Sequence, residues 1–337
     1  MTEFELIARY FARPVQERQG VGDDCALIDV GDRTLAITTD LLSEGVHFFR
    51  DVDPASLGHK ALAVNLSDLA AAGARPRCFL LALSLPPPRA DPAWLEAFSG
   101  ALFELEGLEG CELVGGDTAH AAPVGAADGP VTVCITAIGE VERATLRGRG
   151  GARAGDDLWV SGELGDAALA LAHARGEVKL DPQQARNCER RLLWPQPRVG
   201  LGLALRGLVS AAIDISDGLV GDLGHVLERS GVGADLQVAQ VPRSEALRTV
   251  ERTLQLRCML AGGDDYELLF TASPSNREAI LAAARRSGIG VTRTGSLTKE
   301  SGLRLLGESG IDATLRAFDH FAGTCQGPPS FDPIRRT

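Results

Sequence analysis

The chain has 337 residues, 45% of them hydrophobic and 23% charged, which is typical of a soluble globular protein of about two domains. Its formal charge of −11 argues against a nucleic-acid-binding protein, because such a protein normally presents a basic surface. The apolar runs fall short of the roughly 20 residues of a membrane helix, and no basic, apolar signal opens the sequence, so we expect no membrane partner. Seven cysteines without a Cys-x-x-Cys pair argue against disulfides or zinc, and a cytoplasmic location is expected.

In chain order, the first half alternates strands with helices. Two segments rich in β-branched residues, 34–39 and 131–136, predict half-buried strands. An acidic residue followed by proline, at 53–54 and again at 91–92, predicts the start of a helix at each place. The first of these helices should run over about 55–72, and its many small residues predict close packing against a sheet.

A stretch rich in glycine and arginine, 147–155, predicts a linker, after which the alternation starts again. The elements expected beyond it are helices near 165–176, 183–193, 217–230 and 275–287, and strands near 157–161, 211–215, 234–239, 266–272 and 290–294. The sequence therefore predicts an α/β (α+β) fold with two domains, 1–146 and 147–322, followed by a flexible tail, 323–337.

The common nucleotide-binding loops are missing from the sequence. Only three of the 34 basic residues are lysines, and none of them lies in the Gly-x-x-x-x-Gly-Lys-Ser/Thr pattern of a P-loop or in a kinase-type strand. The one near match to a dinucleotide loop, 148–153, lacks the third glycine. A phosphate-binding site in this chain must therefore be built in another way.

Six short acidic motifs suggest a phosphate-binding site built on metal ions. Each places a carboxylate beside glycine, a small hydroxyl residue or another carboxylate, and the oxygen ligands that Mg²⁺ prefers are of this kind. Asp-Gly pairs are also common in turns, so the indication lies in the number of motifs. The six are Gly22-Asp23-Asp24, Thr38-Thr39-Asp40, Asn65-Leu66-Ser67-Asp68, Gly115-Gly116-Asp117-Thr118, Asp214-Ile215-Ser216-Asp217-Gly218 and Gly262-Gly263-Asp264-Asp265-Tyr266-Glu267. Several divalent metals would also reverse the local negative charge for an anionic substrate.

Two of the motifs lie at informative places. Asn65 and Asp68 share one side of the first predicted helix, whose neighbours are nearly all apolar, so a buried metal or substrate contact is favoured over a solvated stripe. Asp214 and Asp217 stand between a strand and a helix. Capping of that helix by Asp217 is the ordinary interpretation, and it is compatible with binding metal or phosphate.

No nucleophile–base arrangement stands out. There is no Gly-x-Ser-x-Gly elbow, no cysteine in an electropositive setting, and a lone histidine such as His47 is more often structural than catalytic. Direct transfer of a group between two substrates, held by metals and backbone amides, is favoured over covalent catalysis.

The motif set resembles the thiamine-monophosphate kinase family, of the superfamily that includes aminoimidazole-ribonucleotide synthetase. The resemblance extends from Phe4 to Phe321, and its order and spacing are specific. It is carried by GVGDDCA (20–26), TTDLLSEGVHF (38–48), NLSDLAAAGA (65–74), VGGDT (114–118), IDISDGL (213–219), GGDDYELLF (262–270) and FDHF (318–321).

The resemblance implies roles for individual residues. Metal ligands would be Asp24, Thr38, Thr39, Asp40, Asp68, Asp117, Asp214 and Asp217, and of these Asp68, Asp117 and Asp217 would be catalytic. ATP would contact Gly116, Asp117, Arg149 and Ser216. The thiamine monophosphate would contact His47, Asp264 and Phe318, where the family often has glutamate at the second position and tyrosine or tryptophan at the third.

The implied fold is an N-terminal α/β domain forming a barrel across a homodimer, with a C-terminal α+β domain and the site between them. The implied activity is direct, Mg²⁺-assisted in-line transfer of the γ-phosphoryl group of ATP to thiamine monophosphate, the last step of thiamine diphosphate biosynthesis. Two alternatives stay open: a sister ATP-using ligase or selenophosphate synthetase, and a metal- or nucleotide-binding protein without activity.

Overall fold

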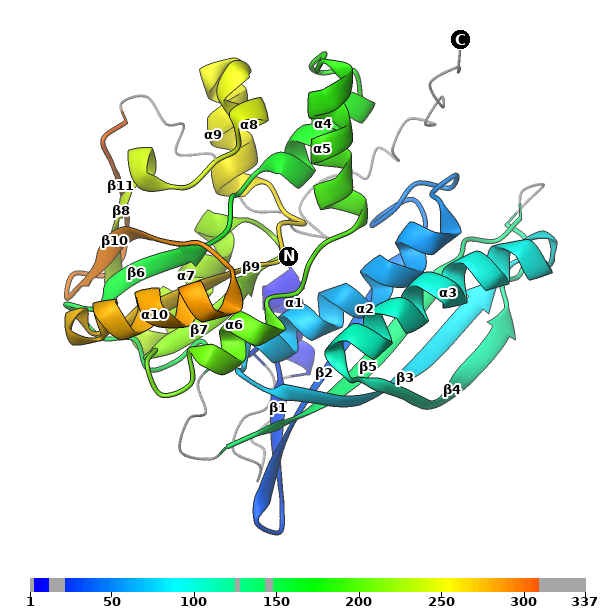
Figure 1. Ribbon diagram of the computed structural model, residues 1–337, viewed down its shortest axis with the longest axis horizontal. Helices are drawn as coiled ribbons and strands as arrows, with labels where there is room; N and C mark the ends of the chain where they lie inside the picture. The colour runs from blue at the N-terminus through cyan, green and yellow to red at the C-terminus, as the bar shows by residue number, and fades with distance from the viewer. Residues whose placement is uncertain (1–2, 12–21, 125–127, 143–147, 309–337) are drawn as a thin grey trace.

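The computed structural model describes residues 3–11, 22–124, 128–142 and 148–308. In this part of the chain two sheets lie side by side with helices around and between them (Figure 1). The expected tail and Phe318 lie outside the described residues. None of the helices described is both long and apolar enough to cross a membrane.

The first sheet has the strand order β1-β2-β5-β3-β4, antiparallel except for the β3–β4 pair. Its strands are β1 (Ala26–Val30), β2 (Arg33–Ser43), β3 (Arg75–Leu85), β4 (Glu112–His120) and β5 (Thr132–Val141). The helices of this half are α1 (Glu3–Tyr10), α2 (Pro54–Ala71) and α3 (Pro92–Glu109), and α2 and α3 run along the same face of the sheet (Figure 1).

The second sheet has the order β11-β8-β10-β6-β9-β7, and only its β8–β11 pair is parallel. Its strands are β6 (Asp157–Ser161), β7 (Ala211–Ile215), β8 (Gly233–Gln237), β9 (Glu267–Ala272), β10 (Val291–Thr298) and β11 (Gly302–Leu306). The helices of this half are α4 (Asp166–Ala174), α5 (Pro182–Leu193), α6 (Val199–Ala204), α7 (Leu219–Ser230), α8 (Glu245–Thr249), α9 (Arg252–Ala261) and α10 (Arg277–Ser287).

Helix α2 joins the two halves. It contacts β2 and β5 of the first sheet and β7 and β9 of the second, which explains why nearly every one of its residues is buried. Asp53 caps it through the N–H of Ala55, as the sequence predicts. Its small residues allow close approach: a Cβ on Gly58 would lie 2.0 Å from the Phe98 carbonyl oxygen of α3.

The mixed α and β content and the two sheets confirm the expected fold class. The bounds of β6 and β7 match the prediction. On α3, Trp94, Phe98 and Leu102 are buried, and Trp94 is stacked on Phe98 at a centroid distance of 5.1 Å. Helices α8 and α9 were not predicted. The Gly115–Thr118 motif lies inside strand β4.

Candidate active site

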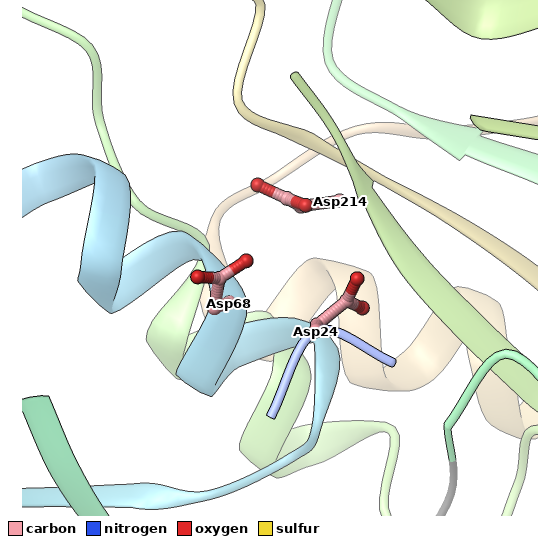
Figure 2. Close-up of side chains that lie close together, drawn as sticks. All are labelled: Asp24, Asp68 and Asp214. Atoms are coloured by element: carbon pink, nitrogen blue, oxygen red, sulfur yellow. The ribbon is translucent and has the colours of Figure 1, made fainter. Parts of the chain in front are cut away.

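Three carboxylates from distant parts of the sequence meet beside α2. One oxygen from each of Asp24, Asp68 and Asp214 lies within 4.8 Å of the others, and the three side chains surround a common space (Figure 2). Asp24 comes from the segment before β1, Asp68 from the last turns of α2, and Asp214 from strand β7. Side chains from both halves of the chain thus form one acidic cluster.

Hydrogen bonds from neighbouring hydroxyl groups hold two of these carboxylates. The Oγ1 of Thr38 on β2 donates to Oδ2 of Asp68, and the Oγ of Ser67 on α2 donates to Oδ2 of Asp214 at 2.7 Å. The Asn65 side chain faces the same strand, because its Oδ1 accepts the backbone N–H of Asp40 at 3.2 Å. The polar side of α2 that the sequence indicates therefore faces β2 and the acidic cluster.

Arg149 supplies positive charge at the edge of the cluster. Its Nε and Nη2 donate to Oδ1 of Asp24 at 2.9 and 2.7 Å, and its backbone N–H donates to the Asp23 carboxylate. Oδ2 of Asp24 is buried and has no hydrogen-bond partner among the described residues. Arg149 thus satisfies one oxygen of Asp24 and leaves the other available to a cation.

Burial and the neighbouring negative charges raise the pKa values of the carboxylates in and around the cluster. Burial raises the pKa of Asp214 to about 8, with the charge of Asp24 adding to the effect. Burial and the charge of Asp217 raise the pKa of Asp40 to about 6, and burial with the charge of Asp40 raises the pKa of Asp68 well above its usual range. Buried carboxylates held this close require protons or cations.

A divalent cation suits this donor set. Three carboxylates and a threonine hydroxyl provide the hard oxygen ligands that Mg²⁺ takes, and the unpartnered Oδ2 of Asp24 offers a lone pair that nothing else described uses. Asp24, Asp68 and Asp214 would hold the ion.

Asp40 lies near the cluster, since its charge raises the pKa of Asp68, and Asp217 lies near Asp40, since its charge raises the pKa of Asp40. The expected capping role of Asp217 is wrong: the N-cap of α7 is Gly218, with no side-chain cap. The buried Asp222 instead accepts the N–H groups of Asp217 and Gly218 at 3.2 and 3.0 Å, and so fixes this turn from inside the helix. Ser216, half-buried in the same turn, accepts the N–H of Asp264 through its carbonyl oxygen at 2.8 Å.

Asp117 and Thr39 lie on the other face of the first sheet. Asp117 pairs with Ala82, Ala82 with Cys134 and Cys134 with the exposed Leu41, so these residues share the face that α2 does not cover. The Oγ1 of Thr39 lies 2.9 Å from that of Thr136 on the same face. Within one chain, Asp117 and Thr39 therefore do not meet the acidic cluster.

Gly116 is required by the sheet itself. A Cβ at this position would lie 1.8 Å from the carbonyl oxygen of Leu81 on β3, so only glycine fits the strand pairing. His47 lies in the turn after β2, where its Nδ1 accepts the backbone N–H of Ser43 at 3.0 Å. A neutral ring at His47 therefore carries its proton on Nε2.

The loop before β9 is held in an unusual conformation. Asp264 and Tyr266 have positive φ angles of 66° and 50°, which is costly for residues with a side chain. The Tyr266 hydroxyl donates to Oδ1 of Asp264 at 2.9 Å, and the Nζ of Lys60 on α2 lies 2.9 Å from the same oxygen. Sequence reasoning missed Lys60, although a single lysine in a helix of small and apolar residues was a usable signal.

The end of this loop is anchored by buried charges. Glu267 is fully buried, and Arg198 and Arg191 donate to it together with the Oγ of Ser161. Burial raises the pKa of Glu267, but the bonds from Arg198 outweigh it, and the pKa lies below its usual value. Asp265 accepts the backbone N–H of Gly165 at 2.9 Å. The loop is thereby fixed on both sides of Asp264.

Comparisons with known proteins agree on one family. Models of the AIR synthase related proteins match residues 22–141 with the N-terminal domain and residues 153–308 with the C-terminal domain. Thiamine-monophosphate kinase of Escherichia coli K12 is 44% identical over 330 residues, which are 95% of this chain and 98% of the relative.

Solved structures agree with the sequence relatives. Thiamine-monophosphate kinase from Stenotrophomonas maltophilia has a TM-score of 0.76 at 41% identity, covering 90% of this chain and 95% of that one. AaThiL complexed with AMPPCP and TMP has a TM-score of 0.79 at 29% identity, covering 95% and 97%. The chain therefore belongs to the thiamine-monophosphate kinase family.

Proposed function

We propose that this protein transfers the γ-phosphoryl group of ATP to the phosphate of thiamine monophosphate, giving thiamine diphosphate and ADP. The observation that carries the proposal is the group of Asp24, Asp68 and Asp214, whose carboxylate oxygens lie within 4.8 Å of one another where the two halves of the chain meet. A relative that binds AMPPCP, an ATP analogue, together with TMP supports the choice of substrates. A site for two phosphates needs such a concentration of metal-binding oxygens.

The residues of the cluster have distinct parts in this proposal. Asp24, Asp68 and Asp214 hold Mg²⁺, and Asp40, Asp217 and Thr38 are assigned to its surroundings; Thr38 donates to Asp68, and the charge of Asp217 acts on Asp40. Bound Mg²⁺ supplies charge neutralisation for the two phosphates. Arg149, which donates to Asp24, and Ser216 are assigned to ATP, and His47, Asp264 and Phe318 are assigned to the acceptor.

The chain need not supply a general base. The acceptor is a phosphate whose second pKa is about 6, so its attacking oxygen is largely deprotonated near neutral pH. The carboxylates of the cluster are assigned to binding cations and not to proton transfer. An alcohol acceptor would need a base.

Thiamine monophosphate should therefore be phosphorylated and unphosphorylated thiamine left essentially untouched. Thiamine lacks both the ionised oxygen and the phosphate that a metal-lined site holds. ATP turnover and chromatography of the products, with both acceptors and an aminoimidazole ribonucleotide precursor side by side, measure this preference. Formation of thiamine monophosphate from thiamine, without diphosphate, would contradict the assignment, and turnover with the precursor alone would favour a sister ligase.

We also propose that the protein works as a homodimer through the uncovered face of the first sheet. Leu41 and Leu80 are 53% and 41% exposed there, beside Thr39 and Asp117. A second copy would cover these leucines. It would also give Asp117, which faces away from the acidic cluster of its own chain, a place in the site of the partner.

Leu80→Asp should convert the dimer to monomer, because it places a charge in the middle of this face. Leu281→Asp is the matched control, since Leu281 is 40% exposed on α10 of the second half. Light scattering coupled to size exclusion gives the mass of each variant. A wild-type monomer, or a Leu80→Asp dimer, would rule out this interface.

A further inference from the structure

Lys60 is an almost fully buried lysine. Its side chain is only 4% exposed, in the middle of α2, and it is one of three lysines in the chain. Burial of an ammonium group is costly without a partner. Lys60 has one, because its Nζ lies 2.9 Å from Oδ1 of Asp264. The ion pair joins the first half of the chain to the second.

Asp264 is the exposed end of this pair. Its side chain keeps 31% of its surface exposed, and its backbone is held at a φ of 66° by the bond from its N–H to the Ser216 carbonyl. The Tyr266 hydroxyl donates to the same Oδ1 that Lys60 contacts. Two donors thus fix one carboxylate oxygen in a strained loop.

Helix α2 connects this pair rigidly to the acidic cluster. Lys60 precedes Asp68 by eight residues, which is about 12 Å along a helix axis. The same helix holds Asp214 through Ser67. A ligand that contacts Asp264 is therefore placed relative to the cluster by the length of α2, provided that Lys60 keeps the loop against the helix.

We propose that Lys60 is a positioning residue for the phosphoryl acceptor: through Asp264 it sets the distance between the acceptor's organic part and the acidic cluster. This inference rests on the proposed function, in which Asp264 contacts the acceptor. Lys60 also balances the charge of Asp264, so that the pair presents a hydrogen-bonding carboxylate without adding net charge to an already acidic site.

The test is Lys60→Met, which removes the charge at nearly constant volume. The KM for thiamine monophosphate should rise about tenfold or more, with kcat within about threefold and the KM for ATP within about twofold. Lys179→Met, at an exposed lysine between α4 and α5, is the matched control and should change nothing. Lys60→Arg keeps the charge and should give an acceptor KM between those of the wild type and Lys60→Met.

A double-mutant cycle separates positioning from a general loss of structure. Because Lys60 acts through Asp264, adding Lys60→Met to Asp264→Asn should raise the acceptor KM by less than about twofold beyond Asp264→Asn alone. Calorimetry with thiamine monophosphate and AMPPCP measures acceptor binding without turnover. The Tm of each variant identifies any that fail to fold. If Lys60→Met is one of them, Lys60→Arg carries the test, and an acceptor KM equal to that of the wild type would overturn the role of Lys60.

The two levels of the proposal fail differently. If the wild-type protein shows no turnover that depends on thiamine monophosphate, the proposed function is wrong. If the wild type is active and Lys60→Met leaves the acceptor KM unchanged, or lowers kcat alone, the role of Lys60 is overturned while the function stands. Full additivity of the effects of Lys60→Met and Asp264→Asn on the acceptor KM would also overturn the role of Lys60.

Discussion

Asp68→Asn is expected to lower kcat by about 10²-fold or more, the scale for losing one strong electrostatic contact in a buried site. Asp68 lies with Asp24 and Asp214 in the cluster and accepts from Thr38, so asparagine keeps the shape and one acceptor but removes the charge. Turnover of ATP with thiamine monophosphate at saturating Mg²⁺ measures the effect.

Asp91→Asn is the control for this substitution. Asp91 caps α3 on the exposed surface, and asparagine caps a helix about as well as aspartate, so kcat should stay unchanged. The Tm is measured alongside, because loss of one of several crowded anions could raise the stability of the metal-free Asp68→Asn protein. A well-folded Asp68→Asn variant with near-wild-type kcat would remove Asp68 from the catalytic set.

The local elements could be predicted because their signals are local. Proline after a capping acid sets the start of α2 and of α3, and strands β6 and β7 carry apolar runs of the right length. The capping of α7 was predicted wrongly because the acceptor, Asp222, lies one turn inside the helix and not at its start. A rule that looks only at the residue before a helix cannot find it.

The sequence predicted the residues of the candidate site through its acidic motifs and the family resemblance, but not their arrangement in space. The acidic motifs identify Asp24, Asp68 and Asp214, but their approach depends on α2 lying between two sheets, which no local pattern encodes. Asp117 belongs to the same motif set and yet faces the opposite side of the sheet, because strand pairing decides its face. The Lys60–Asp264 contact joins residues 204 positions apart, and only the tertiary structure brings them together.

The metal-free protein is expected to lose stability as pH rises from about 4 to about 8. The pKa of Asp214 is raised from 3.8 to about 8 by burial and by Asp24, and that of Asp40 from 3.8 to about 6 by burial and by Asp217. Between these values the folded state binds more protons than the unfolded state, so the free energy of unfolding falls with pH. The whole fall should be on the order of 5–10 kcal/mol, since each tenfold difference in proton affinity between the two states corresponds to about 1.4 kcal/mol.

Addition of Mg²⁺ should reverse this loss above pH 7, because a bound cation neutralises the carboxylates that are deprotonated there. Denaturant unfolding in chelator and in excess Mg²⁺, at several pH values, gives both curves. Asp214→Asn removes the group whose pKa is raised to about 8, so the fall between pH 6 and 8 should become shallower in chelator. If the metal-free wild type gains stability over that interval, or Mg²⁺ leaves its curve unchanged, the cluster is not a buried set of ionised ligands and the assignment of the metal site is wrong.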